Sequence, residues 1–341
     1  MNRLDFLKYA GMGIAGTALF GRGVNGRISD IPENGLVKAH RLQEGDQIGL
    51  VAPAGIVFDS SEFERMKLVL ESMGFRIRFG THVRSRSGYF SGNDSERAED
   101  VNRMFEDSEI DGIVAVRGGW GSARILEGLD YDLIRNHPKF FCGFSDITAL
   151  HLSLLRHSNL VTFHGPNGTS DWTRFTQRHF YSIATGQFEN VLQNPEKQRS
   201  EIRTLRPGSA SGPLLGGNLT VLNSLLGTRY LPNFRGAILY LEEIGEAVYR
   251  VDRMLAQLKL SGILGQINGV VFGRCTDCET VLRDSPGLMS VLESYLLPLE
   301  IPAFYGSMIS HEPNQFTLPV GIPAEIDASA GTIRLMENPL L

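Results

Sequence analysis

A serine, a glutamate and a histidine in this sequence each stand beside a strand-like run, where catalytic groups are often found. Ser145 follows the apolar run 140–144 and precedes a helix-like segment, which is the layout of a nucleophile elbow. The unpaired amides at the start of that helix could stabilise an oxyanion, with the amide of Asp146 as one donor. The alternative is that Ser145 only caps the helix, because the full G-x-S-x-G pattern is absent.

A serine nucleophile needs a base to take its proton and a third group to hold that base. His311 stands in the loop-like stretch 307–314, and loop histidines near strand ends are often functional. His164 ends another strand-like run and is the rival candidate. The other histidines fall mostly on predicted helices or surface turns and suit solvated or structural roles: His40, His82, His137, His151, His157 and His179.

Two neighbouring carboxylates, Glu242 and Glu243, close the apolar run 237–241. Burial of a carboxylate is costly without a partner, so one of them could orient the ring of His311. The alternative is that both are solvated where the strand emerges. The chain order would then be serine, glutamate, histidine, and the sequence alone does not bring the three together in space.

A glycine loop, 117–121, follows the strand-like run 110–116. Glycines let a backbone approach a ligand closely, so Gly118 or Gly119 could supply a second oxyanion donor. Arg117 could pair with a substrate carboxylate through two parallel hydrogen bonds. A plain turn is the alternative, while a phosphate loop is poorly supported because no Gly-Lys-Ser/Thr follows.

Composition narrows the class of protein. The 341 residues are 42% hydrophobic and 21% charged with a net charge of -5, as in ordinary globular proteins. Without a basic run or patch we expect no binding to nucleic acid. Three cysteines do not make a disulfide framework. Cys275 and Cys278 lack the further ligands of a zinc site, so we interpret them as structural or incidental, with a disulfide as the alternative.

The N-terminal segment 1–36 looks like a signal followed by a linker. Arg3 and Lys8 precede an apolar run, 9–20, that is too short to span a bilayer. The stretch 2–8 looks like a twin-arginine export signal without its second arginine. We therefore expect a periplasmic protein without stable membrane insertion. A cytoplasmic protein with a packed or disordered N-terminal segment is the alternative.

Strand-like and helix-like segments alternate from residue 47 onward, which predicts a parallel sheet covered by helices on both faces. Sites in such sheets lie at the carboxyl ends of the strands. A capping box beginning at Ser61 should start the first helix of the alternation. We predict an N-terminal α/β domain with the elbow at 37–175, a connection at 176–211, and a smaller β-rich α+β domain at 212–341.

Several segments in family order resemble the LD-carboxypeptidase family of serine peptidases, which includes the microcin C immunity peptidase. The resemblance runs from about residue 45 to the C-terminus and rests on 48–55, 88–121, 143–148, 163–166, 216–219, 241–246 with Arg250 and 253–255, and 311–321. The family usually has tyrosine where this chain has Trp120, which keeps an aromatic group but could change the pocket.

The resemblance implies roles for individual residues: Ser145 as nucleophile, His311 as general base, Glu242 as orienting acid, and Asp146 and Gly119 as oxyanion donors. It also implies a site between the two domains, a homodimer, and no metal or organic cofactor. The expected reaction releases a terminal D-amino acid from a murein tetrapeptide, a small peptide with a free carboxylate. The alternatives are an amidase on nucleotide–peptide conjugates and a catalytically silent wall-peptide binder.

Overall fold

The computed structural model describes residues 35–280 and 284–341. Its helices and strands, in chain order, are β1 (Gln47–Val51), α2 (Ser61–Ser72), β2 (Arg76–Phe79), α3 (Asp94–Glu106), β3 (Gly112–Ala115), η1 (Ser122–Gly128), α4 (Tyr131–Asn136), β4 (Phe140–Gly143), η2 (Ser145–Ile147), α5 (Thr148–Ser158), β5 (Thr162–His164), α6 (Arg174–Ala184), β6 (Val191–Gln193), η3 (Glu196–Glu201), β7 (Arg203–Arg206), β8 (Ser209–Asn218), α7 (Leu219–Ser224), β9 (Ile238–Ile244), α8 (Val248–Leu260), β10 (Gly269–Thr276), α9 (Leu288–Leu296), η4 (Leu297–Leu299), β11 (Ala303–Tyr305), β12 (Leu318–Val320), β13 (Pro323–Asp327) and β14 (Thr332–Leu335).

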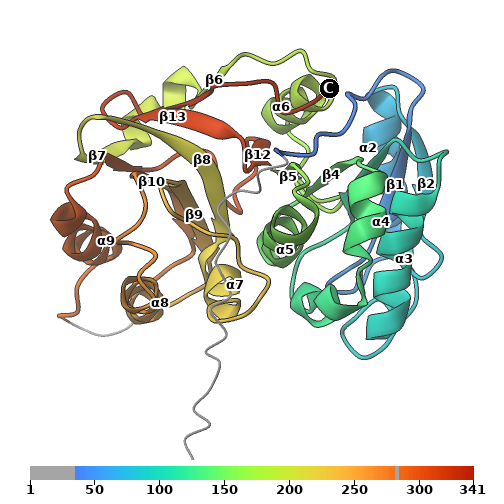
Figure 1. Cartoon of the computed structure of the whole chain (residues 1–341), viewed down its shortest axis with the longest axis horizontal. Helices are drawn as coiled ribbons and strands as arrows, with labels where there is room; N and C mark the ends of the chain where they lie inside the picture. The colour runs from blue at the N-terminus through green and yellow to red at the C-terminus, as the bar shows by residue number, and fades with distance from the viewer. Residues whose placement is uncertain (1–34, 281–283) are drawn as a thin grey trace, which may run out of the picture. The chain divides into compact units, whose positions relative to one another are not determined.

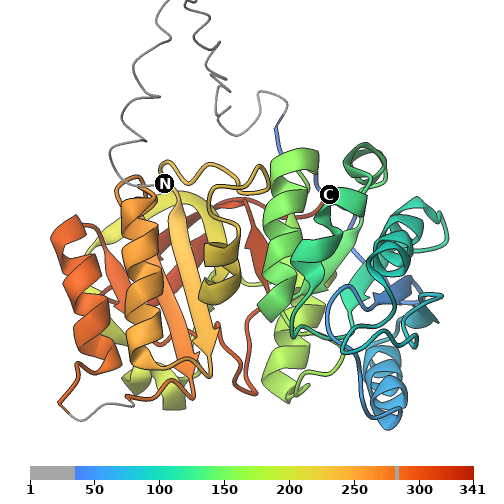
Figure 2. The same ribbon diagram turned by 90° about the horizontal axis from the view of Figure 1, so that it is seen from below.

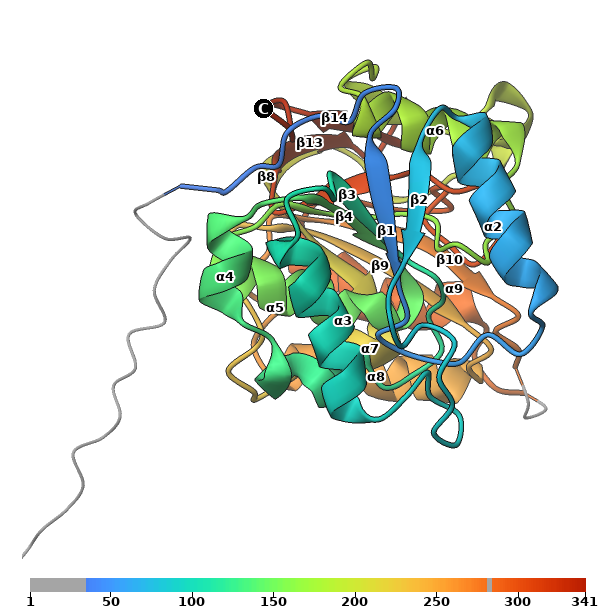
Figure 3. The ribbon, with the colours of Figure 1, turned by 90° about the vertical axis from the view of Figure 1, so that its right-hand side faces the viewer.

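The first sheet has the order β12-β5-β4-β3-β1-β2, and its five N-terminal strands are parallel. The central strands β1, β3 and β4 are buried along their whole length, because helices cover both faces of a parallel sheet. Helices α2 and α3 lie on opposite sides of β1 and β2 (Figure 3). The predicted parallel α/β arrangement is confirmed.

The second sheet has the order β6-β14-β13-β8-β9-β10-β11-β7. Strands β8, β9, β10 and β11 are parallel, and antiparallel strands flank them. Helices α8 and α9 lie side by side along this sheet (Figure 2). Helix α5 lies between β4 and β8, so it separates the two sheets (Figure 1).

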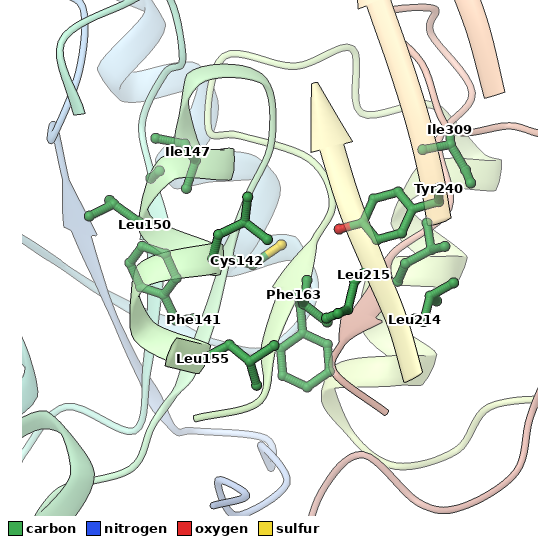
Figure 4. Packing of buried hydrophobic residues seen from close by; sticks show 14 of the residues in the cluster. Phe141, Cys142, Ile147, Leu150, Leu155, Phe163, Leu214, Leu215, Tyr240 and Ile309 are labelled. Atoms are coloured by element: carbon green, nitrogen blue, oxygen red, sulfur yellow. The ribbon is translucent and has the colours of Figure 1, made fainter. Parts of the chain in front are cut away.

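The core continues from one sheet to the other. Phe141 and Phe163 of the first sheet, Leu150 and Leu155 of α5, and Leu215 of β8 are buried in a single cluster. Figure 4 shows these side chains meeting between the strands. Apolar burial of this kind stabilises a fold by about 25 cal/mol per Å², so the two sheets support each other.

The predicted domain boundaries need two changes. Residues 318–320, which we placed in the C-terminal domain, form β12 and pair antiparallel with β5 of the first sheet. The stretch 176–211, which we interpreted as a connection, contributes β6 and β7 to the second sheet. These strands have three and four residues, too few to give a clear alternation in the sequence.

The capping box predicted at Ser61 is wrong. Helix α2 begins after Ser60, whose backbone is already helical and whose side chain makes no capping bond. The Asp59 carboxylate instead accepts from the amide of Ser61 at 2.9 Å. A capping box does occur at the start of α3, where Asn93 and Glu96 bond to each other's amides.

Candidate active site

Ser145 is the first residue of the 3-10 helix η2, at the sharp turn that follows β4. Its φ is +65°, in the left-handed region that non-glycine residues avoid and that is characteristic of strained functional positions. Asn167 holds the preceding residue, because its side-chain oxygen accepts from the Phe144 amide at 3.1 Å and its nitrogen donates to the Phe144 carbonyl at 3.4 Å. The predicted elbow is therefore present as a geometric feature.

The glycine loop packs directly against this turn. A Cβ added to Gly118 would lie 2.8 Å from the Cβ of Ser145 and 3.1 Å from its Oγ. Gly119 has a φ of +103°, and the Gly118 carbonyl accepts from the Gly55 amide at 3.1 Å. The loop thus requires glycine at two successive positions for different reasons, close approach at Gly118 and a left-handed backbone at Gly119.

We expect Gly118→Ala to lower kcat/KM on the order of 100-fold, because the new methyl would push Ser145 or the loop by a fraction of an ångström. Steady-state kinetics on the peptide substrate expected from the sequence resemblance would measure the effect. Gly287→Ala is the matched control, since a Cβ there meets nothing within 4 Å. A Gly118→Ala enzyme with the kinetics of the control would show that the loop does not set the position of the serine.

Asp146 fastens the end of the glycine loop to the elbow. Its buried carboxylate accepts from the Ser122 amide at 2.7 Å, and the Ser122 hydroxyl donates to the Asp146 carbonyl at 2.5 Å. Burial raises the pKa of Asp146, and the hydrogen bonds from Ser122 oppose the rise. The Asp146 side chain therefore has a structural role. Its backbone amide, at the start of η2, remains the candidate oxyanion donor.

Glu242 of β9 and His311, in the loop between β11 and β12, form a short hydrogen bond. The His311 Nδ1 lies 2.6 Å from the Glu242 Oε2. The Glu242 side chain is completely buried, and that of His311 is 13% exposed. The carboxylate near the end of β9 therefore fixes the Nδ1 nitrogen of the imidazole.

Burial alone would lower the pKa of His311. The charge of Glu242, its hydrogen bond to the ring and the nearby Glu243 together outweigh burial, so the pKa of His311 is raised above its usual 6.5. The pair is thus arranged to stabilise a protonated imidazole, as the general base of an acyl-transfer reaction requires.

Arg274 anchors the loop that carries His311. Its guanidinium pairs with Glu312 at 2.9 Å and with Glu201, and it is 14% exposed. On the other side of the loop, the Gln315 amide donates to the Ser310 carbonyl at 2.6 Å. The histidine is therefore held on a braced loop.

The elbow and the Glu242–His311 pair lie next to each other. The ring of Phe144, which precedes Ser145, is 4.7 Å from the ring of His311 between centroids. Thr148, at the start of α5, accepts at its hydroxyl from the Asn218 amide at 3.0 Å. Asn218 ends β8 and pairs in register with Glu242, so the first helix after the serine contacts the strand beside the acid.

The second carboxylate, Glu243, has a different environment from Glu242. One oxygen accepts from the Asn218 side chain and the Ile244 amide, both at 2.9 Å, and the other accepts from the amide and hydroxyl of Thr220, at 2.8 and 2.7 Å. Burial raises its pKa and these hydrogen bonds oppose the rise. Glu243 therefore holds the start of α7 and does not face His311 through a hydrogen bond.

His164, the rival base, is buried at the end of β5 and makes no ion pair in the described part of the chain. Burial lowers its pKa well below 6.5, so the ring stays neutral. His151 in α5 is also buried; it bonds to Thr162 and to the Gly143 carbonyl, and burial lowers its pKa to about 4. Of these three histidines, only His311 has a carboxylate partner.

Arg117 and Trp120 flank the glycine loop. Arg117 is half-buried; one of its nitrogens donates to the Ile56 carbonyl at 2.8 Å, and its guanidinium lies 5.4 Å from the Phe58 ring centre. Trp120 is half-exposed and its ring lies 5.5 Å from that of Phe90. Arg117 takes part in no ion pair among residues 35–280 and 284–341.

Sequence reasoning assigned no role to three residues that position the site: Arg97, Asn167 and Arg274. Arg97 is buried in α3 and donates to the Pro53 carbonyl and, at 3.0 Å, to the Gly121 carbonyl, which ties the glycine loop to the end of β1. Its place on the helix face that also carries Val101 and Met104 was the available signal. For Asn167 and Arg274 the sequence offered none, because their partners are distant backbone and loop groups.

The described residues contain no group of three histidine, cysteine, aspartate or glutamate side chains that could hold a metal ion. Nor does any helix in that part of the chain have the length and apolar character needed to cross a bilayer. Cys275 and Cys278 are joined by a disulfide, and Cys142 is a buried free thiol. The export-like segment predicted at 1–36 lies almost entirely outside the described residues.

Comparisons with known proteins agree with this architecture. The model of the LD-carboxypeptidase N-terminal domain matches residues 48–165, and that of the C-terminal domain matches residues 211–326. A probable murein peptide carboxypeptidase of Bacillus subtilis is 36% identical over 300 residues, which cover 86% of this chain and 93% of that protein.

Two solved structures share the fold. The complex of MccF with glutamyl sulfamoyl guanosine has a TM-score of 0.84 at 25% identity and covers 89% of this chain and all of that one. The muramoyltetrapeptide carboxypeptidase of Oxalobacter formigenes has a TM-score of 0.72 at 32% identity, with 85% and 97% covered. Since both family models match and a relative at 36% identity spans most of the chain, this protein belongs to the LD-carboxypeptidase family of serine-type peptidases.

Proposed function

We propose that the protein is a serine carboxypeptidase in which Ser145 attacks the substrate carbonyl, His311 takes and returns the proton, and Glu242 holds the imidazole. The observation that carries this proposal is the 2.6 Å hydrogen bond between Glu242 and His311, placed beside the strained turn at Ser145. With Nδ1 bound to the carboxylate, Nε2 is the nitrogen available to the serine hydroxyl.

The amides of Gly119 and Asp146 would stabilise the oxyanion formed on attack. Asp146 stands at the N-terminus of η2, where amides lack helical partners, and the glycine loop touches Ser145. Two such donors aimed at the developing charge account for a large part of acyl-transfer catalysis.

For the substrate, we propose a murein tetrapeptide from which a terminal D-alanine is released. The names of the Bacillus and Oxalobacter relatives support this substrate class. Arg117 has nitrogens besides the one bound to Ile56, and these could pair with the substrate carboxylate, with Trp120 beside them. Incubation with the tetrapeptide should release D-alanine. Release of no amino acid from it, with the protein folded, would contradict the proposal.

The pH profile tests His311 as the base. Its raised pKa means that the neutral, active form of the ring is lost as the pH falls through a value above 6.5. We therefore expect the acid limb of kcat/KM, measured between pH 5 and 9, to have its midpoint above 6.5. An acid limb below 6.5 would point to a different base, because a neutral buried imidazole such as that of His164 titrates lower.

An amidase acting on nucleotide–peptide conjugates is the second candidate. It is favoured by the similarity to MccF, whose solved structure contains glutamyl sulfamoyl guanosine. A substrate panel with the tetrapeptide and an aminoacyl sulfamoyl nucleoside in parallel would separate the two activities. A silent wall-peptide binder, the third candidate, predicts tight binding of the tetrapeptide with no turnover. The homodimer expected from the resemblance stays a prediction.

We also propose that the protein works outside the cytoplasm, in an oxidising compartment. The Cys275–Cys278 disulfide supports this location, because such bonds persist mainly in exported proteins. Thiol labelling of denatured protein from its own cells should find one free cysteine, Cys142, before reduction and three after. Three free thiols before reduction, together with an intact Met1, would place the protein in the cytoplasm.

A further inference from the structure

Near the Glu242–His311 pair, several buried polar atoms have no hydrogen-bond partner among the residues that the structure describes. Glu242 Oε2 bonds to His311, but Oε1 is buried and makes no hydrogen bond among the described residues. A carboxylate oxygen removed from water is costly unless a donor reaches it. A hydrogen-bond donor that reaches Oε1 would offset this cost.

Tyr240 is in the position to supply that donor. It lies two residues before Glu242 on β9, so both side chains leave the strand on the same face. The Tyr240 hydroxyl is buried and has no partner among the described residues. Figure 4 shows it directed away from β9, toward the side of Cys142 and Phe163.

The protonation state of Tyr240 is the one that a hydrogen-bond donor needs. Burial, and then the negative charge of Glu242, raise the pKa of Tyr240 far above its usual value. The phenol therefore keeps its proton at any working pH and can only donate toward an anion.

His164 completes the group from the opposite sheet. Its ring meets that of Tyr240 edge-on, with centroids 5.3 Å apart, and its buried Nδ1 has no partner among the described residues. Burial keeps the ring neutral by lowering its pKa, so it offers one donor and one acceptor. His164 of β5 and Tyr240 of β9 are thus in ring contact, and Glu242 leaves β9 on the same face as Tyr240.

We propose that Tyr240 is a positioning residue for the Glu242–His311 pair, donating to Glu242 Oε1 through one internal water that His164 also holds. Such a water, with several polar partners, is a normal part of a protein interior. The inference rests on the proposed function, because it explains how the orienting carboxylate is itself held in place. It also gives His164 a structural role, whereas the proposed general base is His311.

Tyr240→Phe tests the proposal, because it removes only the hydroxyl. With the donor gone, the charge on Glu242 acts more fully on the imidazole, so the pKa of His311, followed by NMR of the intact protein, should rise above that of the wild type. At neutral pH, kcat/KM should fall about tenfold, the size expected for one hydrogen bond to a charged group, and its acid limb should move to higher pH. The other charged or titrating groups near the ring are Glu243, His164, and the pair Arg274 and Glu312, and this variant leaves all of them in place.

Tyr131→Phe is the matched control. Its hydroxyl donates to the Leu126 carbonyl at 2.9 Å and contacts neither Glu242 nor His311, so it should change Tm without moving the pKa of His311. If the Tyr240 hydroxyl were simply unpaired, Tyr240→Phe would raise Tm and leave the pKa of His311 and the pH profile unchanged, which would overturn the proposal. A lowered pKa of His311 would overturn it as well.

The NMR measurement needs no substrate, so the two proposals can fail separately. A response of His311 to Tyr240→Phe in a protein that cleaves no tetrapeptide would contradict the proposed function and support the positioning role. An active enzyme in which Tyr240→Phe leaves the pKa of His311 unchanged would support the proposed function and contradict the positioning role.

Discussion

Ser145→Ala should lower kcat for tetrapeptide hydrolysis by at least about 10⁴-fold, with little change in substrate affinity. The expectation follows from the loss of the proposed nucleophile, since the remaining groups can orient water but do not form the acyl-enzyme. Stopped assays of D-alanine release with purified variant would measure the rate, and calorimetric titration with the tetrapeptide would measure binding.

The fold should tolerate this substitution. Alanine keeps the Cβ that packs near Gly118 and takes the same left-handed backbone at about the same cost, so Tm should stay within a few degrees of the wild type. Asn167 and Asp146 continue to hold the turn. A Ser145→Ala enzyme with undiminished kcat would remove Ser145 from the mechanism.

How far the sequence could predict the fold depended on the length of each element. Residues 47–51 and 94–106 carry a clear apolar pattern in the sequence, and they form β1 and α3. The three-residue strands β6 and β12 carry no clear apolar pattern, and their partner strands lie far away in the chain. No periodicity can show that residues 318–320 cross to the other sheet, because only long-range packing decides it.

The candidate site could also be predicted only in part. A carboxylate at a strand end and a histidine in a loop were visible as types, and the structure places Glu242 and His311 in hydrogen-bond contact. Which of the adjacent carboxylates faces the ring was not visible from the residues alone. It follows from the alternation of side chains along β9, which turns Glu243 toward Asn218 and Thr220.

The residues that hold the site were the hardest to predict. Asn167 bonds to the backbone of Phe144, and Arg274 pairs with Glu201 and Glu312. Such contacts join chain segments that are more than 20 residues apart, and the side chains are of types that are common on any surface. The sequence therefore predicts the reacting groups better than the groups that position them.

Glu242→Gln should lower kcat by about 10³- to 10⁴-fold at neutral pH while leaving the chain folded. The glutamine amide can present an N–H to His311 Nδ1, which puts the ring proton on Nε2 and blocks the nitrogen that would accept the serine proton. The substitution also removes the negative charge that raises the pKa of His311 against burial. The pKa of His311 should then fall below 6.5, and the acid limb of the residual kcat/KM should move to lower pH.

Glu243→Gln is the matched control for that variant, because it makes the same chemical change one residue further along β9. The Glu243 carboxylate accepts from Asn218, Thr220 and Ile244, so its loss should cost about 1–3 kcal/mol of stability and change kcat by less than about tenfold. Urea unfolding with parallel kinetics would separate the two effects. If both variants lost activity equally, the hydrogen bond between Glu242 and His311 would have no special part in catalysis, and the two carboxylates would act only through the fold.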